Sequence, residues 1–199
     1  MTLRLITAYT RTGKDTFVDQ VNGQLDYIHP WIVFTHPNKP MDDYKEIFAP
    51  GNKLSFAASL KKTVVQNLGL PEDFDVEANK DTYMIEGKLL RQHLIEYAFQ
   101  MRQIDQAFFV KEALRDMNGD CIVSDFRFID EYEFIAAHVK VPVTTIRLFR
   151  SSVEVPPPHI ISEHDLDEFE TDVLLVSSDQ SYDIACDHFP QYRSYVRQN

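Results

Sequence analysis

The first twenty residues contain the pattern that most constrains the fold. An apolar run over 3–8 predicts a short buried strand, and a polar turn with one glycine follows it. Phe17 and Val18 then open a predicted helix over 15–23. Unpaired backbone N–H groups and the helix dipole meet at the N-terminus of such a helix. This stretch therefore predicts an anion-binding loop.

The loop matches the phosphate-loop pattern G-x-x-x-x-G-K-[S/T] in part. Gly13 and Lys14 fit, and Lys14 is placed to reach the terminal phosphates of a nucleotide. Ala8 replaces the first glycine, and Asp15 stands where a magnesium-binding hydroxyl usually lies. Asp15 could hold magnesium directly or through water, or Thr16 could supply the hydroxyl. The alternative is a surface turn with a solvated lysine.

Composition bounds the class of protein. The chain has 199 residues, 44% of them hydrophobic, and a net charge of −11, which is typical of one soluble domain over 1–199. The acidic balance argues against nucleic acid as a partner, and the absence of a long apolar run argues against a membrane. Cys121 and Cys186 lack a metal-ligand spacing and are expected as reduced core residues, in a cytoplasmic setting. A homodimer is left open.

Strand-like and helix-like stretches alternate along the chain. This alternation predicts an α/β fold of three layers, with a five-stranded parallel sheet flanked by helices. The proline-rich segment 24–52 favours loop packing, and 70–118 is expected as a second excursion from the core. The predicted strands are 3–8, 53–57, 121–123, 143–149 and 172–176.

A second acidic element lies at the end of the third predicted strand. Ligands of parallel sheets bind beyond the carboxyl ends of the strands, where both the Lys14 loop and Asp125 fall. Asp125 could hold magnesium through water, and Arg127 could meet a phosphate bidentately. The alternative for Asp125 is a helix cap or surface ion pair, and Arg11 could equally be a solvated loop residue.

Phosphoryl transfer depends mainly on positioning and charge neutralisation, so several cations should converge on one cleft. Each arginine taken singly is more often a surface charge than a ligand. No H-E-x-x-H or G-x-S-x-G pattern supports a zinc site or a serine hydrolase. The candidate arginines are Arg91, Arg102, Arg127 and Arg147.

Four elements in order give the chain a family resemblance between residue 3 and about 176. They resemble those of the phage-type deoxynucleoside monophosphate kinases within the P-loop nucleotide kinases. The loop and the D-x-R-F-x-x-E element are the specific parts. The four are Arg11-x-Gly13-Lys14-Asp15-Thr16, Phe56-Ala57-x-x-Leu60-Lys61, Asp125-x-Arg127-Phe128-x-x-Glu131, and His159 with Ser162-Glu163.

The resemblance implies a P-loop kinase fold with a nucleotide-binding excursion and a mobile lid near 127–165. It also implies transfer of the ATP γ-phosphate to a (deoxy)nucleoside monophosphate, which gives the deoxynucleoside diphosphate (dNDP) and ADP. ATP and Mg²⁺ are the implied cofactors. Ala8 and the pair Ala58-Ser59 depart from the family pattern.

Site residues are carried over one by one from the same resemblance. The loop residues, including Thr12 and Gly13, would bind ATP phosphates. Lys61 and Arg91 would approach the monophosphate. Arg102 and Arg147 are further substrate-binding candidates from the convergence of cations, not from the resemblance. The expected catalytic set is Lys14, Arg127, Asp125 and Arg11, and the expected metal ligands are Asp15, Thr16 and Asp125.

Three alternatives remain at this point. A related P-loop kinase could phosphorylate another small acceptor, such as phosphomevalonate, or a hydroxymethylated base in DNA. The acidic balance counts against the DNA substrate. The chain could also be a non-catalytic nucleotide-binding regulator, given Ala8 and Asp15.

Overall fold

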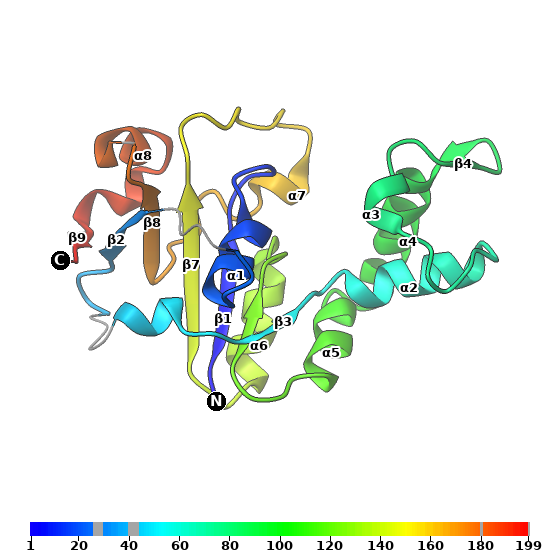
Figure 1. Ribbon diagram of the computed structural model, residues 1–199, viewed down its shortest axis with the longest axis horizontal. Coiled ribbons are helices and arrows are strands. Elements are labelled where there is room, and N and C mark those ends of the chain that lie inside the picture. Colours follow the sequence, from blue (N-terminus) through cyan, green and yellow to red (C-terminus); the bar gives the residue numbers. More distant parts are fainter. Residues whose placement is uncertain (26–29, 40–43, 180, 199) are drawn as a thin grey trace. The chain divides into compact units, whose positions relative to one another are not determined.

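Seven strands of the computed structural model form one sheet in the order β3-β6-β1-β7-β8-β2-β9 (Figure 1). The structure describes residues 1–25, 30–39, 44–179 and 181–198. The chain divides into two compact units, Met1–Leu54 with Asn118–Asn199 and Ser55–Met117, and the sheet belongs to the first. Its strands are β1 (Leu3–Thr7), β2 (Trp31–Thr35), β3 (Asn52–Leu54), β6 (Cys121–Val123), β7 (Val143–Phe149), β8 (Val173–Ser177) and β9 (Val196–Arg197).

The five predicted strands are the five parallel strands of this sheet. β1 pairs in parallel with β6 on one side and β7 on the other, and β3 and β8 extend the parallel set outward. The prediction of a five-stranded sheet is wrong in number, because β2 pairs antiparallel with β8 and β9 pairs antiparallel with β2.

The missed strand β2 lies inside the segment 24–52, where loop packing was expected. Its sequence WIVFT is rich in the β-branched and aromatic residues that favour strands, but the prolines around it point to loops. β9 has two residues, too few for a period-two pattern to show. Residues 26–29 and 40–43 of that segment lie outside the described residues.

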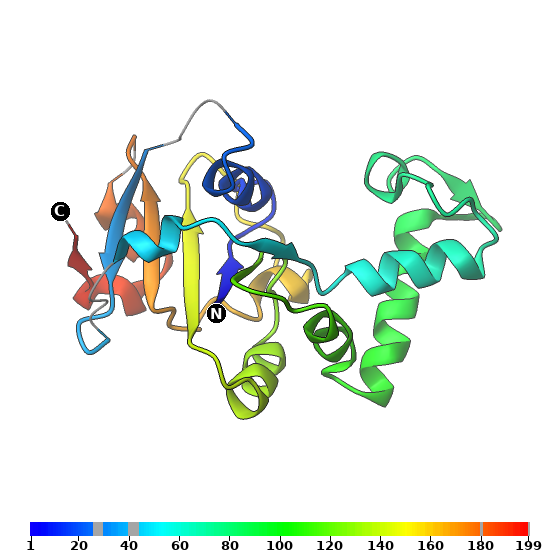
Figure 2. The same ribbon diagram turned by 60° about the horizontal axis from the view of Figure 1, so that its bottom comes forward.

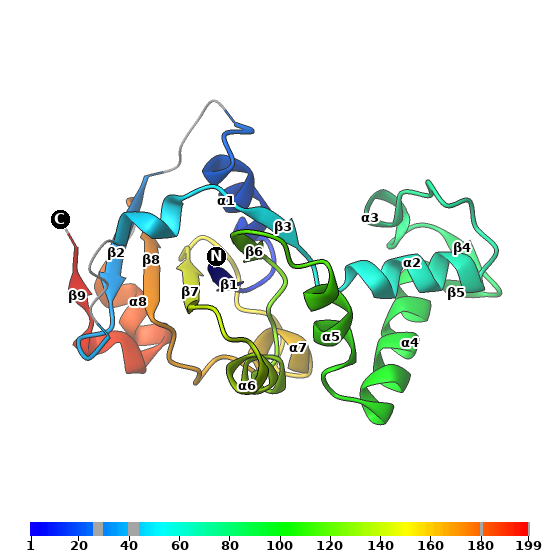
Figure 3. The same cartoon turned by 90° about the horizontal axis from the view of Figure 1, so that it is seen from below.

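Helices cover both faces of the sheet, with α1 on one face and α6 and α8 on the other (Figure 3). Phe17 and Val18 of α1 pack with Ile6 of β1, whereas Ala185 of α8 packs with Leu174 of β8. This confirms the α/β class with helices flanking a mostly parallel sheet. The helical elements of this unit are α1 (Lys14–Val21), η1 (Tyr44–Phe48), α6 (Ile129–His138), α7 (Ile161–His164), α8 (Tyr182–His188) and η2 (Pro190–Ser194).

The two cysteines are confirmed as buried and free. Cys121 begins β6, and Cys186 packs in the cluster around α8.

The second unit is helical and has its own apolar core. Val64 and Val65 of α2 pack with Leu90 and Leu94 of α4, and Val76 of α3 completes the buried set. Its elements are α2 (Ala58–Asn67), α3 (Val76–Asn79), β4 (Met84–Ile85), β5 (Lys88–Leu89), α4 (Leu90–Ile104) and α5 (Phe108–Arg115). β4 and β5 pair as an antiparallel hairpin.

None of the described helices has the length and apolar character that a membrane crossing requires.

Arg147 of β7 is a structural arginine. Its side chain is 1% exposed, its Nε donates to the Tyr192 hydroxyl at 2.9 Å, and its Nη2 donates to the Leu166 carbonyl. The guanidinium also lies 4.3 Å from the centre of the Phe189 ring, within cation–π range. These contacts fix the C-terminal elements to the sheet, because a buried cation is tolerated when its donors are satisfied.

Replacing Tyr192 by phenylalanine is expected to lower the free energy of unfolding by about 1–3 kcal/mol, because Arg147 Nε would remain buried without an acceptor. Urea denaturation measures the change. The matched control is Tyr132→Phe, since the Tyr132 hydroxyl makes no hydrogen bond within the described part of the chain; it should stay within about 0.5 kcal/mol of the unmodified protein. Equal effects of the two substitutions would contradict this role of Tyr192.

Candidate functional site

Loops after β1, β6 and β7 leave the sheet at one edge, because these strands are parallel neighbours (Figure 2). Side chains connect the loops directly. Ser124, after β6, donates to Asp15 Oδ1 at 2.9 Å. Arg150, after β7, places its Cζ atom 4.0 Å from where a Cβ on Gly13 would lie. The candidate site is therefore built from residues far apart in sequence.

The loop after β1 turns sharply into α1. Gly13 has a φ of +98°, which glycine adopts easily, and α1 begins at the next residue. Arg11 has a φ of +65°, a left-handed conformation that is uncommon for a residue with a side chain. No side chain caps α1, so the N–H groups of its first turn lack intrahelical partners. Such N–H groups suit an anion.

Lys14 is bound to its own loop. Its Nζ donates to the Ala8 carbonyl at 2.5 Å and to the Tyr9 carbonyl at 3.0 Å. Burial and the neighbouring Arg127 cation lower the pKa of Lys14 to about 8, against the opposing effect of Glu163. Two cations from different strand ends are thus close enough to repel each other.

Glu163 of α7 links the loop to the end of β6. Its carboxylate accepts from the Thr10 backbone N–H at 2.7 Å and forms an ion pair with the Arg127 guanidinium. The Glu163 side chain is 7% exposed and that of Arg127 is 34% exposed, so the pair is partly shielded from water. An internal carboxylate therefore holds two donors that could bind an external anion.

Asp15 is held in place by two neighbours. Lys53 of β3 contacts its Oδ1 at 2.7 Å, and Ser124 donates to the same atom. Burial alone would raise the pKa of Asp15, but the hydrogen bonds from Lys53 and Ser124 outweigh it and the pKa is lowered. Asp15 is therefore a carboxylate at neutral pH.

The expected metal ligands Asp15, Thr16 and Asp125 offer hard oxygen donors. No group of three or more His, Cys, Asp or Glu side chains suited to a metal occurs in the described ranges. Mg²⁺ in nucleotide sites typically uses one or two carboxylates together with substrate phosphates and water. Asp15 and Asp125 are two carboxylates close enough to Lys14 for their charges to raise its pKa, and they fit that requirement.

The predicted residues divide between the units. The first unit brings together the loop residues Arg11 to Thr16 with Asp125 and Arg127. Thr12 is buried, whereas Arg11 is exposed and contacts no described side chain by hydrogen bond or ion pair. Arg147 lies instead in the buried network with Tyr192, so its contacts support a structural role rather than substrate binding.

Three other candidates lie in the second unit. Lys61 pairs with Glu77 at 2.6 Å, and Arg91 Nη2 donates to Asp81 at 2.8 Å. The hydrogen bond that Arg91 donates to Asp81 raises the pKa of Arg91, and the charge of Glu77 adds to this effect. Arg102 lies in the last turn of α4.

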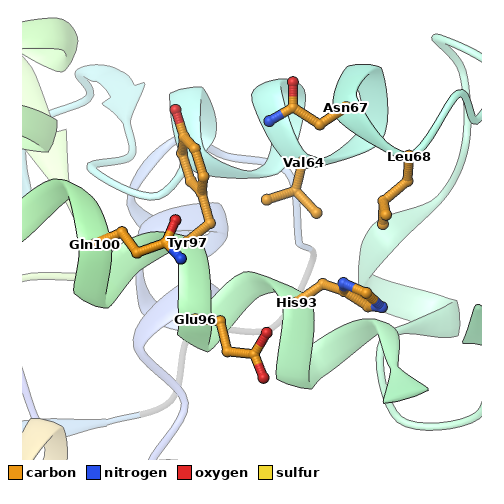
Figure 4. Close-up of a pocket in the computed structure, with 7 residues that line it drawn as sticks. All are labelled: Val64, Asn67, Leu68, His93, Glu96, Tyr97 and Gln100. Carbon is orange, nitrogen blue, oxygen red and sulfur yellow. The ribbon is translucent and has the colours of Figure 1, made fainter. Parts of the chain in front are cut away.

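The second unit also contains a pocket of about 150 Å³ between α2 and α4 (Figure 4). Polar side chains from α4 face Val64 and Asn67 of α2, and Leu68 just after α2, across it. Its lining residues are Val64, Asn67, Leu68, His93, Glu96, Tyr97 and Gln100.

Sequence reasoning missed Lys53 and Arg150 and gave Glu163 no role. Arg150 directly follows β7 and Asp125 lies two residues after β6, so the rule that found Asp125 could also have found Arg150. The pairing of Lys53 with Asp15 depends on the side-by-side placement of β3 and β6, which no local pattern shows.

No protein-family model matches the chain, and no curated protein matches it.

Replacing Glu163 by alanine is expected to speed hydrogen exchange at the Thr10 amide about tenfold or more, because a charge-assisted hydrogen bond is lost. Amide exchange followed by NMR measures this. The control is Glu154→Ala, an exposed glutamate of the segment that precedes α7, which should leave Thr10 unchanged. Unaltered Thr10 exchange in the Glu163 variant would show that the bond does not protect the loop.

Proposed function

We propose that the chain is an ATP-dependent nucleoside monophosphate kinase, which transfers the γ-phosphate of ATP to a (deoxy)nucleoside 5′-monophosphate. The observation that supports this most is the approach of Lys14 and Arg127 at the uncapped N-terminus of α1. Phosphoryl transfer requires converging cations and backbone donors more than covalent chemistry. The choice of acceptor rests on the family resemblance of the sequence.

In this proposal the loop after β1 binds the donor phosphates. The N–H groups of the first turn of α1 and the Lys14 ammonium supply the donors. Lys14 exchanges the carbonyls of Ala8 and Tyr9 for phosphate oxygens, which are stronger acceptors because they are charged. Arg11, exposed within the loop, adds positive charge near the donor.

Arg127 would bind the transferred phosphate. It must first leave Glu163, so phosphate binding is coupled to release of the segment that contains α7. That segment lies in the lid predicted over 127–165. Lid movements of this kind exclude water and complete the set of catalytic groups.

The proposed magnesium ligands are Asp15, Thr16 and Asp125. Bound there, Mg²⁺ would neutralise charge on the donor phosphates. Lys53 and Ser124 fix the Asp15 carboxylate from the side of β3 and β6, which keeps its oxygens in a defined orientation.

The second unit would supply the acceptor-binding cations. Lys61 and Arg91 are each paired with a carboxylate, Glu77 and Asp81, and both pairs are partly exposed. Exposed pairs contribute little to stability, so an incoming phosphate dianion can replace the carboxylate at small cost. Arg102 is a further candidate on α4.

The proposal is tested by measuring ADP release from Mg-ATP with each natural deoxynucleoside and ribonucleoside monophosphate in turn. Rapid turnover with one or a few acceptors would support the kinase and identify its substrate. ATP binding with no turnover on any acceptor would contradict it, and would favour another acceptor or a nucleotide-binding regulator.

Lys14→Met is expected to reduce turnover about 10²–10³-fold, because one charged donor to the transferring phosphates is lost. The fold should persist, since the ammonium contacts loop carbonyls rather than the core. Steady-state kinetics and thermal melting measure the two effects. The exposed Lys140→Met serves as control and should retain full turnover. Full turnover in Lys14→Met would refute the assignment of the phosphate loop.

ATP affinity is expected to fall as pH rises above about 8, because unbound Lys14 then loses its proton while phosphate binding raises its pKa. Between the pKa of Lys14 in the unbound protein and its higher pKa in the ATP complex, the dissociation constant of ATP rises up to about tenfold per pH unit. Calorimetric titrations from pH 7 to 10 measure this. Lys14→Arg keeps its charge over that range and should show a flat profile. A parallel decline in Lys14→Arg would assign the pH dependence to another group.

A further inference from the structure

Arg150 lies over the start of α1. A Cβ placed on Gly13 would lie 4.0 Å from Arg150 Cζ and 3.9 Å from Thr16 Oγ1. The guanidinium and the Thr16 side chain therefore flank the same position at the loop end. Arg150 reaches it from the end of β7, whereas Asp125 and Arg127 follow β6.

An aromatic ring holds Arg150 in this position. Its Cζ lies 5.2 Å from the centre of the Trp31 ring, within cation–π range. Trp31 in turn meets the buried Phe17 ring edge-on, at 6.2 Å between centroids, so the support extends into α1. A ring face orients the guanidinium plane, but it accepts no hydrogen bonds from the N–H groups that lie in that plane.

One hydrogen-bond donor of Arg150 is left without an acceptor. Its Nε is buried and makes no hydrogen bond, and no carboxylate pairs with the guanidinium in the part of the chain that the structure describes. Arg147 and Arg127, by contrast, donate to Tyr192 and Glu163. A buried donor without an acceptor is costly in a folded protein, which points to an acceptor that arrives with a ligand.

The chemistry of that ligand follows from the neighbours. A planar fork of charged N–H donors fits the oxygens of a phosphate bidentately. The adjacent first turn of α1 also favours negative charge, and Lys14 lies at the same helix end.

We propose that Arg150 is a ligand of the phosphate chain of a nucleoside triphosphate, binding the phosphate group nearest Thr16 while Trp31 supports its other side. The inference rests on the proposed nucleotide site. It adds a third cation, from a third strand end, to Lys14 and Arg127.

Calorimetric titration with Mg-ATP and with inorganic tripolyphosphate tests the proposal. Arg150→Met keeps the aliphatic stem and removes the fork, so it is expected to weaken both ligands by about ten- to a hundredfold. Arg150→Lys should recover part of the loss through its charge. Arg193→Met, which removes an exposed arginine paired with Asp187, should change neither affinity.

The pair of ligands distinguishes phosphate binding from contact with the base. Loss of ATP affinity alone, with tripolyphosphate unaffected, would overturn the proposal in favour of base stacking. Unchanged affinity for both would overturn any role in binding.

The single tryptophan supplies a local readout. Because Trp31 lies under the guanidinium, tripolyphosphate should change its fluorescence in the unmodified protein, and this change should be much reduced in Arg150→Met. A fluorescence change that persists undiminished would contradict the proposed position.

Failure of the two proposals can be separated. An unmodified protein that binds both ligands in an Arg150-dependent way, yet phosphorylates no acceptor, would refute the kinase and retain Arg150 as a phosphate ligand. Turnover that is intact and independent of Arg150 would support the kinase and refute Arg150 as a phosphate ligand. An unmodified protein that binds neither ligand would overturn both.

Discussion

The pairing of β1 on both of its edges is the constraint on which the rest of the first unit depends. All five residues of β1 are buried, and its parallel registers with β6 and β7 fix the carboxyl ends of three strands beside one another. Residues separated by 109 positions, such as Asp15 and Ser124, can then share a hydrogen bond. The geometry of the candidate site therefore derives its precision from the sheet, which is rigid, rather than from the loops that carry the side chains.

Three cations meet at this edge, and each is balanced in a different way. Lys14 donates to backbone carbonyls, Arg127 pairs with Glu163, and Arg150 lies on the Trp31 ring. Mutual repulsion and burial both oppose such a cluster, as the lowered pKa of Lys14 shows. The cluster is tolerated because each of the three cations has its own partner in direct contact. A polyphosphate could replace the contacts of Lys14 and Arg127 while Arg150 stays on the Trp31 ring, and release of Glu163 by Arg127 links the proposed binding event to movement of α7.

The sequence predicts well where a pattern is both local and regular. The apolar strands ending at Val123 and Phe149, the helices between them and the glycine turn at Gly13 all follow from residue periodicity and turn chemistry. The sequence does not show the contacts of Arg147, because an arginine in a strand gives no sign of whether Tyr192 lies opposite it 45 positions later. β2 fails for a related reason. Its pairing with β8 is antiparallel and long-range, and the flanking prolines outweigh five strand-forming residues.

Asp15 is the departure from the phosphate-loop pattern that most threatens the proposed function, since a carboxylate beside the loop repels phosphate. The structure contains the compensation. Lys53 from β3 lies 2.7 Å from the Asp15 carboxylate, and Ser124 donates to the same oxygen, so the added negative charge is matched by a positive one. Neither partner is adjacent to Asp15 in sequence, and both reach it because β3, β6 and β1 are neighbours. Substitution of the usual hydroxyl by Asp15 is thus consistent with a loop that still attracts anions, through a pair that forms only when the sheet is assembled.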